Sequence, residues 1–203
     1  MAGLIAAVYE DLETATDALQ ALVDAGTRRH EISLAARDET REYSQIIEGH
    51  TDTDETDGEN VADGEGTGTG ALIGTLTGLV TALGPLEVRG IGRVIAAGPL
   101  MAALAGGPAR GSAGAMSGSM VTALADLGVP APDAEVYAEA VRRGGVLVGV
   151  DAAAYDAAAT AEIMDEYAPI DIAVSEAKWR EHGWEDFDES TPADAGGDLR
   201  GGL

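Results

Sequence analysis

The chain has 203 residues, of which 36 are Asp or Glu and 12 are Lys or Arg, so its formal net charge is −24. This negative field repels nucleic-acid phosphates and anionic lipid headgroups, and nucleic acid is therefore not expected among the partners. Cysteine is absent, which excludes disulfides, thiol catalysis and metal sites built on cysteine. The N-terminus lacks the basic start of a signal peptide, so we expect a cytoplasmic protein, with membrane association as the alternative.

The first part of the chain, 1–37, is predicted to form a β-α-β unit. Residues 3–10 are a short apolar run rich in β-forming residues, and residues 11–26 repeat apolar side chains at helical spacing. Residues 30–37 alternate apolar and polar side chains, which is typical of a strand with one covered face.

Two segments of different composition follow this unit. Residues 38–65 are acidic and without periodicity, and we interpret them as a linker. Residues 66–127 are rich in glycine, alanine and other apolar residues. Pro85, Pro99 and Pro108 divide this insertion, and because proline ends or kinks a helix, we expect several helical pieces.

The second half, 128–184, is predicted to contain four elements in the order helix, strand, helix, strand. These are 132–145, 146–152, 153–168 and 170–176. The tail, 185–203, is acidic and rich in glycine, and we expect it to be disordered.

Without the insertion, the predicted order is β-α-β followed by β-α-β, which indicates an α+β protein with a ferredoxin-like, split βαβ sheet. Two helices would cover one face of this sheet. The other face must be covered by the insertion or by a partner subunit, and both alternatives favour assembly.

Glycine recurs at helical spacing in the insertion, in two sets. The sets are Gly66, Gly70, Gly74 and Gly78, and Gly107, Gly111, Gly114 and Gly118. On a helix each set forms a stripe without side chains, which a second helix can approach closely. Each interior glycine costs roughly 0.5–1 kcal/mol relative to alanine, so the packing of helices must compensate. We therefore predict that the two sets mediate oligomerisation as a glycine zipper.

The insertion also admits a membrane alternative, in which a Gly-rich helical hairpin enters lipid. Residues 66–86 carry no charge, but they contain many threonines and glycines. Residues 94–109 are interrupted by prolines, and no basic cluster flanks either segment. A buried hairpin in a soluble oligomer is the favoured interpretation.

Tryptophan and arginine supply two further candidates. Trp179 and Trp184 either anchor the C-terminal segment on the chain's own core or dock into a neighbouring copy. Arg142 and Arg143 lie at a predicted helix end, where the helix dipole favours cations, and they could also pair with acidic groups of a neighbouring subunit.

The patterns expected of catalytic or cofactor sites fail. Residues 50–60 are similar to a calcium loop, but its required glycine and glutamate positions do not match. His30, His50 and His182 lie far apart, and the glycine-rich run 64–70 lacks the lysine of a phosphate-binding loop. We therefore predict no catalytic residue, no cofactor and no metal.

The segment 124–152 contains a string that resembles a known family. Its matching residues are Gly128, Val129, Pro130, Glu135, Tyr137, Glu139, Val141, Gly144, Gly145, Leu147 and Val148. In this respect the chain resembles bacterial general stress proteins with the heat-induced stress domain, where such a string follows a glycine-zipper insert. The resemblance extends over most of 1–189, implies a stress-associated protein, and assigns no catalytic residues.

Together these patterns favour a non-enzymatic, self-assembling stress-associated or structural protein whose partner is itself. The alternatives are the membrane-associated protein described above and, with the least support, a regulator that binds a small ligand or ion on its sheet.

Overall fold

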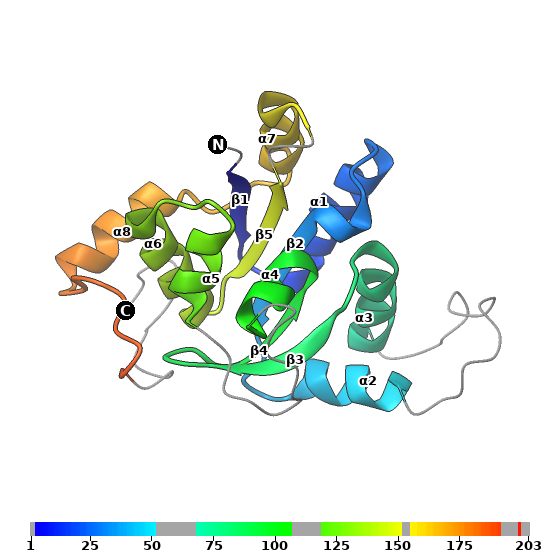
Figure 1. Cartoon of the computed structure of the whole chain (residues 1–203), viewed down its shortest axis with the longest axis horizontal. Coiled ribbons are helices and arrows are strands. Elements are labelled where there is room, and N and C mark those ends of the chain that lie inside the picture. The colour runs from blue at the N-terminus through cyan, green and yellow to red at the C-terminus, as the bar shows by residue number, and fades with distance from the viewer. Residues whose placement is uncertain (1–2, 52–67, 107–118, 152–154, 192–198, 200–203) are drawn as a thin grey trace.

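The computed structural model describes residues 3–51, 68–106, 119–151, 155–191 and 199. Within these ranges the protein is a mixed α+β structure, with a five-stranded antiparallel sheet covered by helices on both faces (Figure 1). The predicted fold class, α+β, is thus confirmed.

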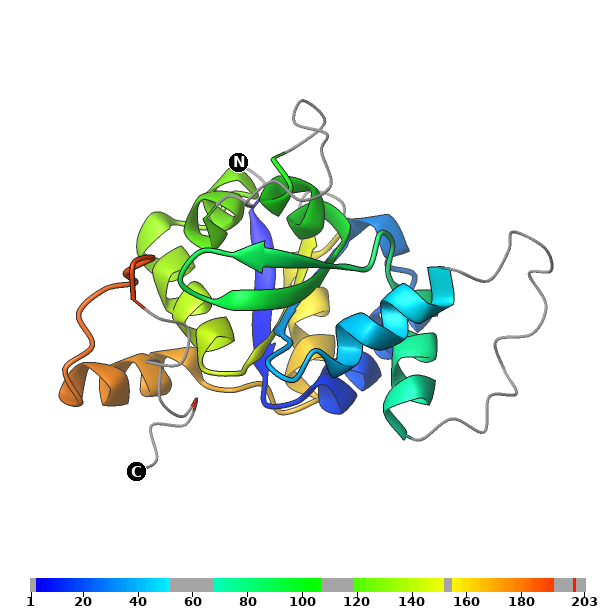
Figure 2. The same cartoon turned by 90° about the horizontal axis from the view of Figure 1, so that it is seen from below.

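The sheet has the strand order β1-β5-β2-β4-β3, and every pair of neighbours is antiparallel. The strands are β1 (Leu4–Tyr9), β2 (Ile32–Arg37), β3 (Gly84–Val88), β4 (Gly92–Ala97) and β5 (Val146–Asp151). Because β5 lies antiparallel between β1 and β2, the latter two are parallel, and with the helix that joins them they form one split β-α-β unit. The sheet twists strongly, so that β3 and β4 cross the direction of β1 (Figure 2).

One face of the sheet is covered by the first helix and by helices on either side of it. These are α1 (Leu12–Asp24), α2 (Glu42–Thr51), α3 (Gly68–Leu79) and α7 (Ala157–Asp165). Alternate strand residues such as Leu34, Ile95 and Val148 are fully buried beneath them. The Tyr9 hydroxyl donates a hydrogen bond of 3.0 Å to the Met164 carbonyl, which ties β1 to α7.

The opposite face is covered by a second group of helices from the same chain. These are α4 (Gly98–Leu104), α5 (Met120–Asp126), α6 (Ala131–Arg142) and α8 (Ile172–Glu181). They pack on the remaining strand residues, including Ala35, Val94 and Leu147. Of the two coverings predicted for this face, the insertion therefore supplies one through α4 and α5, and no partner subunit is needed to bury it.

Aspartates begin three of the helices. Asp11 accepts a hydrogen bond of 2.7 Å from the Thr14 amide at the start of α1. Asp156 and Asp171 accept from amides in the first turns of α7 and α8 in the same way. Such caps satisfy amides that have no partner inside the helix, which fixes where each helix begins.

The prediction of a wholly helical insertion over 66–127 is wrong for 84–97, which form the hairpin β3–β4. Pro85 lies on the edge strand, where a missing N–H breaks no bond to an outer neighbour. Gly90 and Gly92 have positive φ angles of 74° and 90° and turn the chain between the strands. Within the described residues, the chain between α3 and α4 therefore forms a β-hairpin and not a helix.

Two further predictions of secondary structure are wrong. The segment 170–176 lies mostly in α8 and is not a strand, because Asp171 caps a helix there. Only the first of the two predicted β-α-β units is therefore present. The predicted linker 38–65 contains α2, whose first turn is held by Asp38, the acceptor of hydrogen bonds from the Tyr43 and Ser44 amides.

Candidate functional site

The helix α3 has two contrasting faces. Its inner face packs against α1 and α2 and buries Ile73, Leu76 and Leu79. Gly70, Gly74 and Gly78 follow one another at intervals of one helical turn on the opposite side. A Cβ atom added at Gly70 or at Gly78 would meet no heavy atom within 4 Å outside the helix's own backbone. In the described part of the chain, nothing therefore lies against these two glycines.

The side chains around the glycines are uncharged, and their hydroxyl protons are bonded within the helix. We call this surface the α3 outer face; it consists of Gly70, Ala71, Gly74, Thr75, Thr77 and Gly78. The Thr75 hydroxyl donates to the Ala71 carbonyl at 3.1 Å, and the Thr77 hydroxyl donates to the Ile73 carbonyl at 2.8 Å. Both hydroxyls are thus bonded to the helix backbone. No charged residue occurs between 66 and 86, so the face is uncharged in a strongly acidic protein.

The other residues predicted for the glycine zipper lie outside the described ranges. They are Gly66, Gly107, Gly111, Gly114 and Gly118. Of the eight predicted glycines, the structure therefore brings together Gly70, Gly74 and Gly78 on one helix, and their role in oligomerisation stays a prediction.

The two tryptophans lie together at the C-terminal side of the molecule. Trp179 is fully buried, and its indole N–H donates to the Leu199 carbonyl at 3.1 Å. The ring of the half-buried Trp184 meets that of Trp179 edge-on, with 6.0 Å between ring centroids. Trp179 thus anchors the C-terminal segment on the chain's own core, the first of its two predicted alternatives. Contact of Trp184 with a neighbouring copy stays a prediction.

Three arginines stack on the aromatic rings of this region. The guanidinium carbons lie 5.1, 4.7 and 4.9 Å from the ring centroids in the pairs Arg142–Phe187, Arg143–Trp179 and Arg180–Trp184. We call these six residues the C-terminal cluster. A cation over an aromatic ring is attracted by the ring's quadrupole. Arg143–Trp179 therefore holds α8 against the end of α6, Arg142–Phe187 holds the segment after α8 there, and Arg180–Trp184 joins that segment to α8.

A buried carboxylate completes the cluster. Glu139 of α6 is fully buried and forms ion pairs with both Arg142 and Arg143, the latter at 2.6 Å between Nε and Oε1. Arg142 is itself almost fully buried, and its carbonyl accepts a hydrogen bond of 2.9 Å from Arg37. The two arginines that were predicted either to serve the helix end or to pair with a neighbouring subunit are thus paired within the chain.

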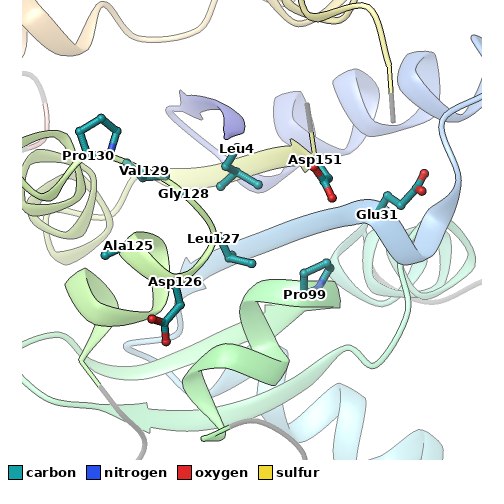
Figure 3. Close-up of a pocket in the computed structure, with 10 residues that line it drawn as sticks. All are labelled: Leu4, Glu31, Pro99, Ala125, Asp126, Leu127, Gly128, Val129, Pro130 and Asp151. Atoms are coloured by element: carbon teal, nitrogen blue, oxygen red, sulfur yellow. The ribbon is translucent and has the colours of Figure 1, made fainter. Parts of the chain in front are cut away.

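A cavity of about 710 Å³ opens at one end of the sheet, and sequence reasoning did not find it. We call it the sheet-end cavity (Figure 3). Its lining residues are Leu4, Glu31, Pro99, Ala125, Asp126, Leu127, Gly128, Val129, Pro130 and Asp151. They come from the start of β1, the end of β5, the 3-10 turn before β2, the start of α4, the end of α5 and the turn between α5 and α6. Three of them, Gly128, Val129 and Pro130, belong to the string that resembles the stress proteins.

Carboxylates and apolar side chains share the lining of this cavity. Leu4, Leu127 and Pro99 point toward its centre in Figure 3. Glu31 accepts hydrogen bonds from the Tyr155 hydroxyl and from Arg28 Nε, the latter at 3.1 Å. The Tyr155 hydroxyl, and after it Arg28, holds the pKa of the Glu31 carboxyl below its usual value, so this carboxylate is ionised at neutral pH.

The described ranges contain no group of three or more His, Asp or Glu side chains arranged to hold a metal ion. The same ranges hold no helix with both the length and the apolar character needed to cross a lipid bilayer.

Comparison of the chain with protein-family models, with curated proteins and with solved structures gives no match. The likeness of 124–152 to general stress proteins accordingly remains a resemblance of one segment.

Proposed function

We propose that this protein is a non-enzymatic, self-associating protein of a stress-associated or structural kind, and that copies meet through the α3 outer face. The observation that supports this most directly is the open glycine stripe. Within the described ranges, Gly70 and Gly78 have free space where a side chain would be, on an uncharged helix face of a chain with a net charge of −24.

The glycines have a cost that nothing in the described chain offsets. A glycine in the interior of a helix loses roughly 0.5–1 kcal/mol relative to alanine. Alanine would fit at Gly70 and at Gly78, because no neighbouring atom occupies the space. A helix of a second copy, laid along the stripe, would gain close backbone contacts that alanine or a larger residue would prevent.

The geometry suits a contact between two identical helices. An α3 that packs on the α3 of another copy about a two-fold axis buries the same residues on both sides, which is the commonest arrangement in homodimers. The hydroxyls of Thr75 and Thr77 are already bonded within the helix, so burying them leaves no hydroxyl proton unpaired.

Charge sets the conditions for this association. Two chains of charge −24 repel one another, and salt screens that repulsion over a distance of about 8 Å at physiological ionic strength. The α3 outer face is uncharged, so two copies can meet there without bringing negative charges into contact. We expect association to strengthen as the salt concentration rises.

Sedimentation velocity at low and high salt tests the proposal. The wild-type chain should sediment as a dimer or larger species at high salt, and the variant Gly70→Leu/Gly78→Leu should sediment as a monomer at every salt concentration. Ala157→Leu is the matched control, because it adds similar bulk at an exposed helix position of α7, outside the α3 outer face. A monomeric wild-type chain, or a leucine variant of unchanged mass, would contradict the proposal.

The stress association and the cytoplasmic location belong to the same proposal and depend on the sequence. The resemblance of 124–152, together with the split β-α-β unit, supports a distant ferredoxin-like relation to the general stress proteins. Measuring the protein's abundance after heat shock, and its distribution between soluble and membrane fractions, tests both. Constant abundance would argue for a structural role without stress association.

A further inference from the structure

We propose that the hole that holds Leu199 is a docking site for an acidic segment with a leucine anchor, and that the chain's own C-terminal segment occupies it as an intramolecular ligand. We call this hole the Leu199 site; it is formed by Val8, Ala140, Gly145 and Trp179. The inference does not depend on self-association, because none of these residues belongs to α3.

The Leu199 site is hollow because Gly145 has no side chain. Leu199 is only 4% exposed and belongs to the hydrophobic core. A Cβ atom on Gly145 would lie 3.2 Å from Leu199 Cδ1, 2.7 Å from Val8 Cγ1 and 2.9 Å from the Ala140 carbonyl oxygen. Even a methyl group at this position would therefore crowd the space that the leucine side chain fills.

The walls of the site are built by the body of the protein. Val8 lies in β1, where it is paired with Leu147 of β5. The amides of Gly144 and Gly145 donate to the carbonyls of Val141 and Ala140 at 3.0 and 2.9 Å, which ends α6 in a Schellman motif. Strand pairing and the helix end thus fix the hole, and Leu199 fills it without forming its walls.

The indole of Trp179 adds a bond to the main chain of the docked segment. Its N–H donates to the Leu199 carbonyl at 3.1 Å, and Trp179 is fully buried. A buried donor that loses its acceptor costs free energy, so an occupied site is favoured over an empty one. Because every residue offers a main-chain carbonyl, this bond holds the segment, whereas the hole beside Gly145 selects the leucine side chain by shape.

Two arginines give the surroundings of the site a positive charge. Arg142 and Arg143 share the single buried carboxylate of Glu139, so these three groups carry a net charge of +1. The Arg143 guanidinium lies 4.7 Å from the centroid of the Trp179 ring, which places this charge beside the site. Residues 185–203 contain six Asp or Glu and one Arg. Charge complementarity therefore favours an acidic segment as the ligand.

The narrow attachment of Leu199 distinguishes a ligand from an element of the fold. Among the described residues, Leu199 alone follows Thr191, so one buried side chain and one main-chain hydrogen bond attach this part of the chain to the body. Main-chain hydrogen bonds combined with a pocket for a side chain are a recurring mode of peptide recognition. Tethering raises the effective concentration of Leu199 at its own site, so the chain excludes a free segment of the same chemistry.

The experiment offers the segment in trans to a full chain whose own anchor is removed. A fluorescently labelled peptide with the sequence of residues 192–203 should bind the Leu199→Ser chain saturably, as measured by fluorescence anisotropy. The wild-type chain should bind the peptide at least tenfold more weakly, because its own Leu199 competes. A peptide with serine in place of the leucine should also bind at least tenfold more weakly.

Val174→Ser is the matched control for the loss of an apolar side chain. Val174 is 50% exposed on α8 and lies outside the Leu199 site, so this variant should bind the peptide as weakly as the wild-type chain does. If a folded Leu199→Ser chain fails to bind, or if it binds the serine peptide equally well, the proposal is overturned.

A measurement on the wild-type chain keeps the test decisive if Leu199→Ser does not fold. In a chain labelled with ¹⁵N-leucine, excess unlabelled peptide should displace the tethered anchor and move the Leu199 amide resonance, while the resonance of Leu34 in β2 stays in place. The serine peptide should move neither. A Leu199 resonance that excess leucine peptide leaves unmoved would overturn the proposal. These measurements leave α3 unaltered, so their failure has no bearing on the dimer measurement.

Discussion

The tryptophans of the C-terminal cluster and the glycines of the α3 outer face were both candidates for contact with other copies, yet their surroundings within the chain are opposite. Trp179 is enclosed by the chain itself, beneath Arg143 and against Trp184. No other part of the described chain lies within 4 Å of where a Cβ atom would be at Gly70 or at Gly78. Rarity in the composition therefore does not by itself indicate an interface. A large side chain can be satisfied by burial within its own chain, whereas a missing side chain gains energy only when another backbone comes close.

The comparison predicts that the C-terminal cluster determines stability. Trp179→Ala should lower the free energy of unfolding by about 3–5 kcal/mol, because it empties a fully buried site and removes the hydrogen bond to Leu199. Urea unfolding followed by far-UV circular dichroism measures this loss. Trp184→Ala should cost clearly less, since Trp184 is only half-buried. Equal losses would show that the two rings share one environment.

The buried ion pairs of the same cluster should have the next largest effect. Glu139→Gln leaves Arg142 and Arg143 without their carboxylate in the interior, and we expect a loss of about 3 kcal/mol that changes little with salt. The matched control is Glu176→Gln, which breaks a pair with Arg180 whose arginine side chain is 52% exposed. That change should cost under about 1 kcal/mol and should depend on salt. A small effect of Glu139→Gln would mean that water reaches the pair.

On the α3 outer face, substitution of glycine should raise the free energy of unfolding and not lower it. Gly70→Ala and Gly78→Ala should each stabilise the monomer by about 0.5–1 kcal/mol, since alanine favours the helix and its methyl group meets no neighbour. Thermal unfolding at low salt and low concentration measures this gain. The same change at Gly26, whose φ angle is 99°, should destabilise the chain. If Gly70→Ala were destabilising, some part of the chain would have to pack on that glycine.

The smallest predicted effect concerns acid. Hydrogen bonds from the side chain and the amide of Ser190 hold the pKa of the Asp188 carboxyl below its usual value of 3.8. A lowered pKa in the folded state means that this turn is stabilised above pH 3.8, and that the stabilisation is lost as the pH falls through the folded pKa. The Ser190 amide resonance should shift in that window, whereas that of Gly74 should not, because α3 contains no titratable side chain. Asp188→Asn should abolish the Ser190 shift.

The sequence predicts those parts of the fold where a local pattern coincides with a packed face. The strand 146–152 and the helix after Asp11 are examples, because burial and capping both appear in the order of residues. The segment 170–176 was predicted wrongly because Ile170, Ile172 and Val174 occupy every second position, as in a strand. In the structure, Asp171 caps a helix that begins at Ile172. The hairpin β3–β4 was not predicted. Pro85 was interpreted as a break between helical pieces, whereas proline is tolerated on an edge strand and Gly90 turns the chain between two strands.

The candidate sites also differ in how much of each is visible in a local sequence pattern. The glycine spacing on α3 is visible in the sequence, although what approaches it is not. The lining of the sheet-end cavity comes from the start of β1, the turn before β2, the start of α4 and the end of β5. These segments lie far apart in the chain, so no local pattern could predict the cavity before the structure.

The place of β5 in the sheet has a consequence for how the protein is made. β5 is the last strand among the described residues, yet it pairs with both β1 and β2, and these two strands have no ladder with each other. β2 can pair with β4 once residues up to 97 have been made, whereas β1 has no strand partner until residues up to 151 have been made. The long-range pairing of β1 with β5 is of the kind that slows folding.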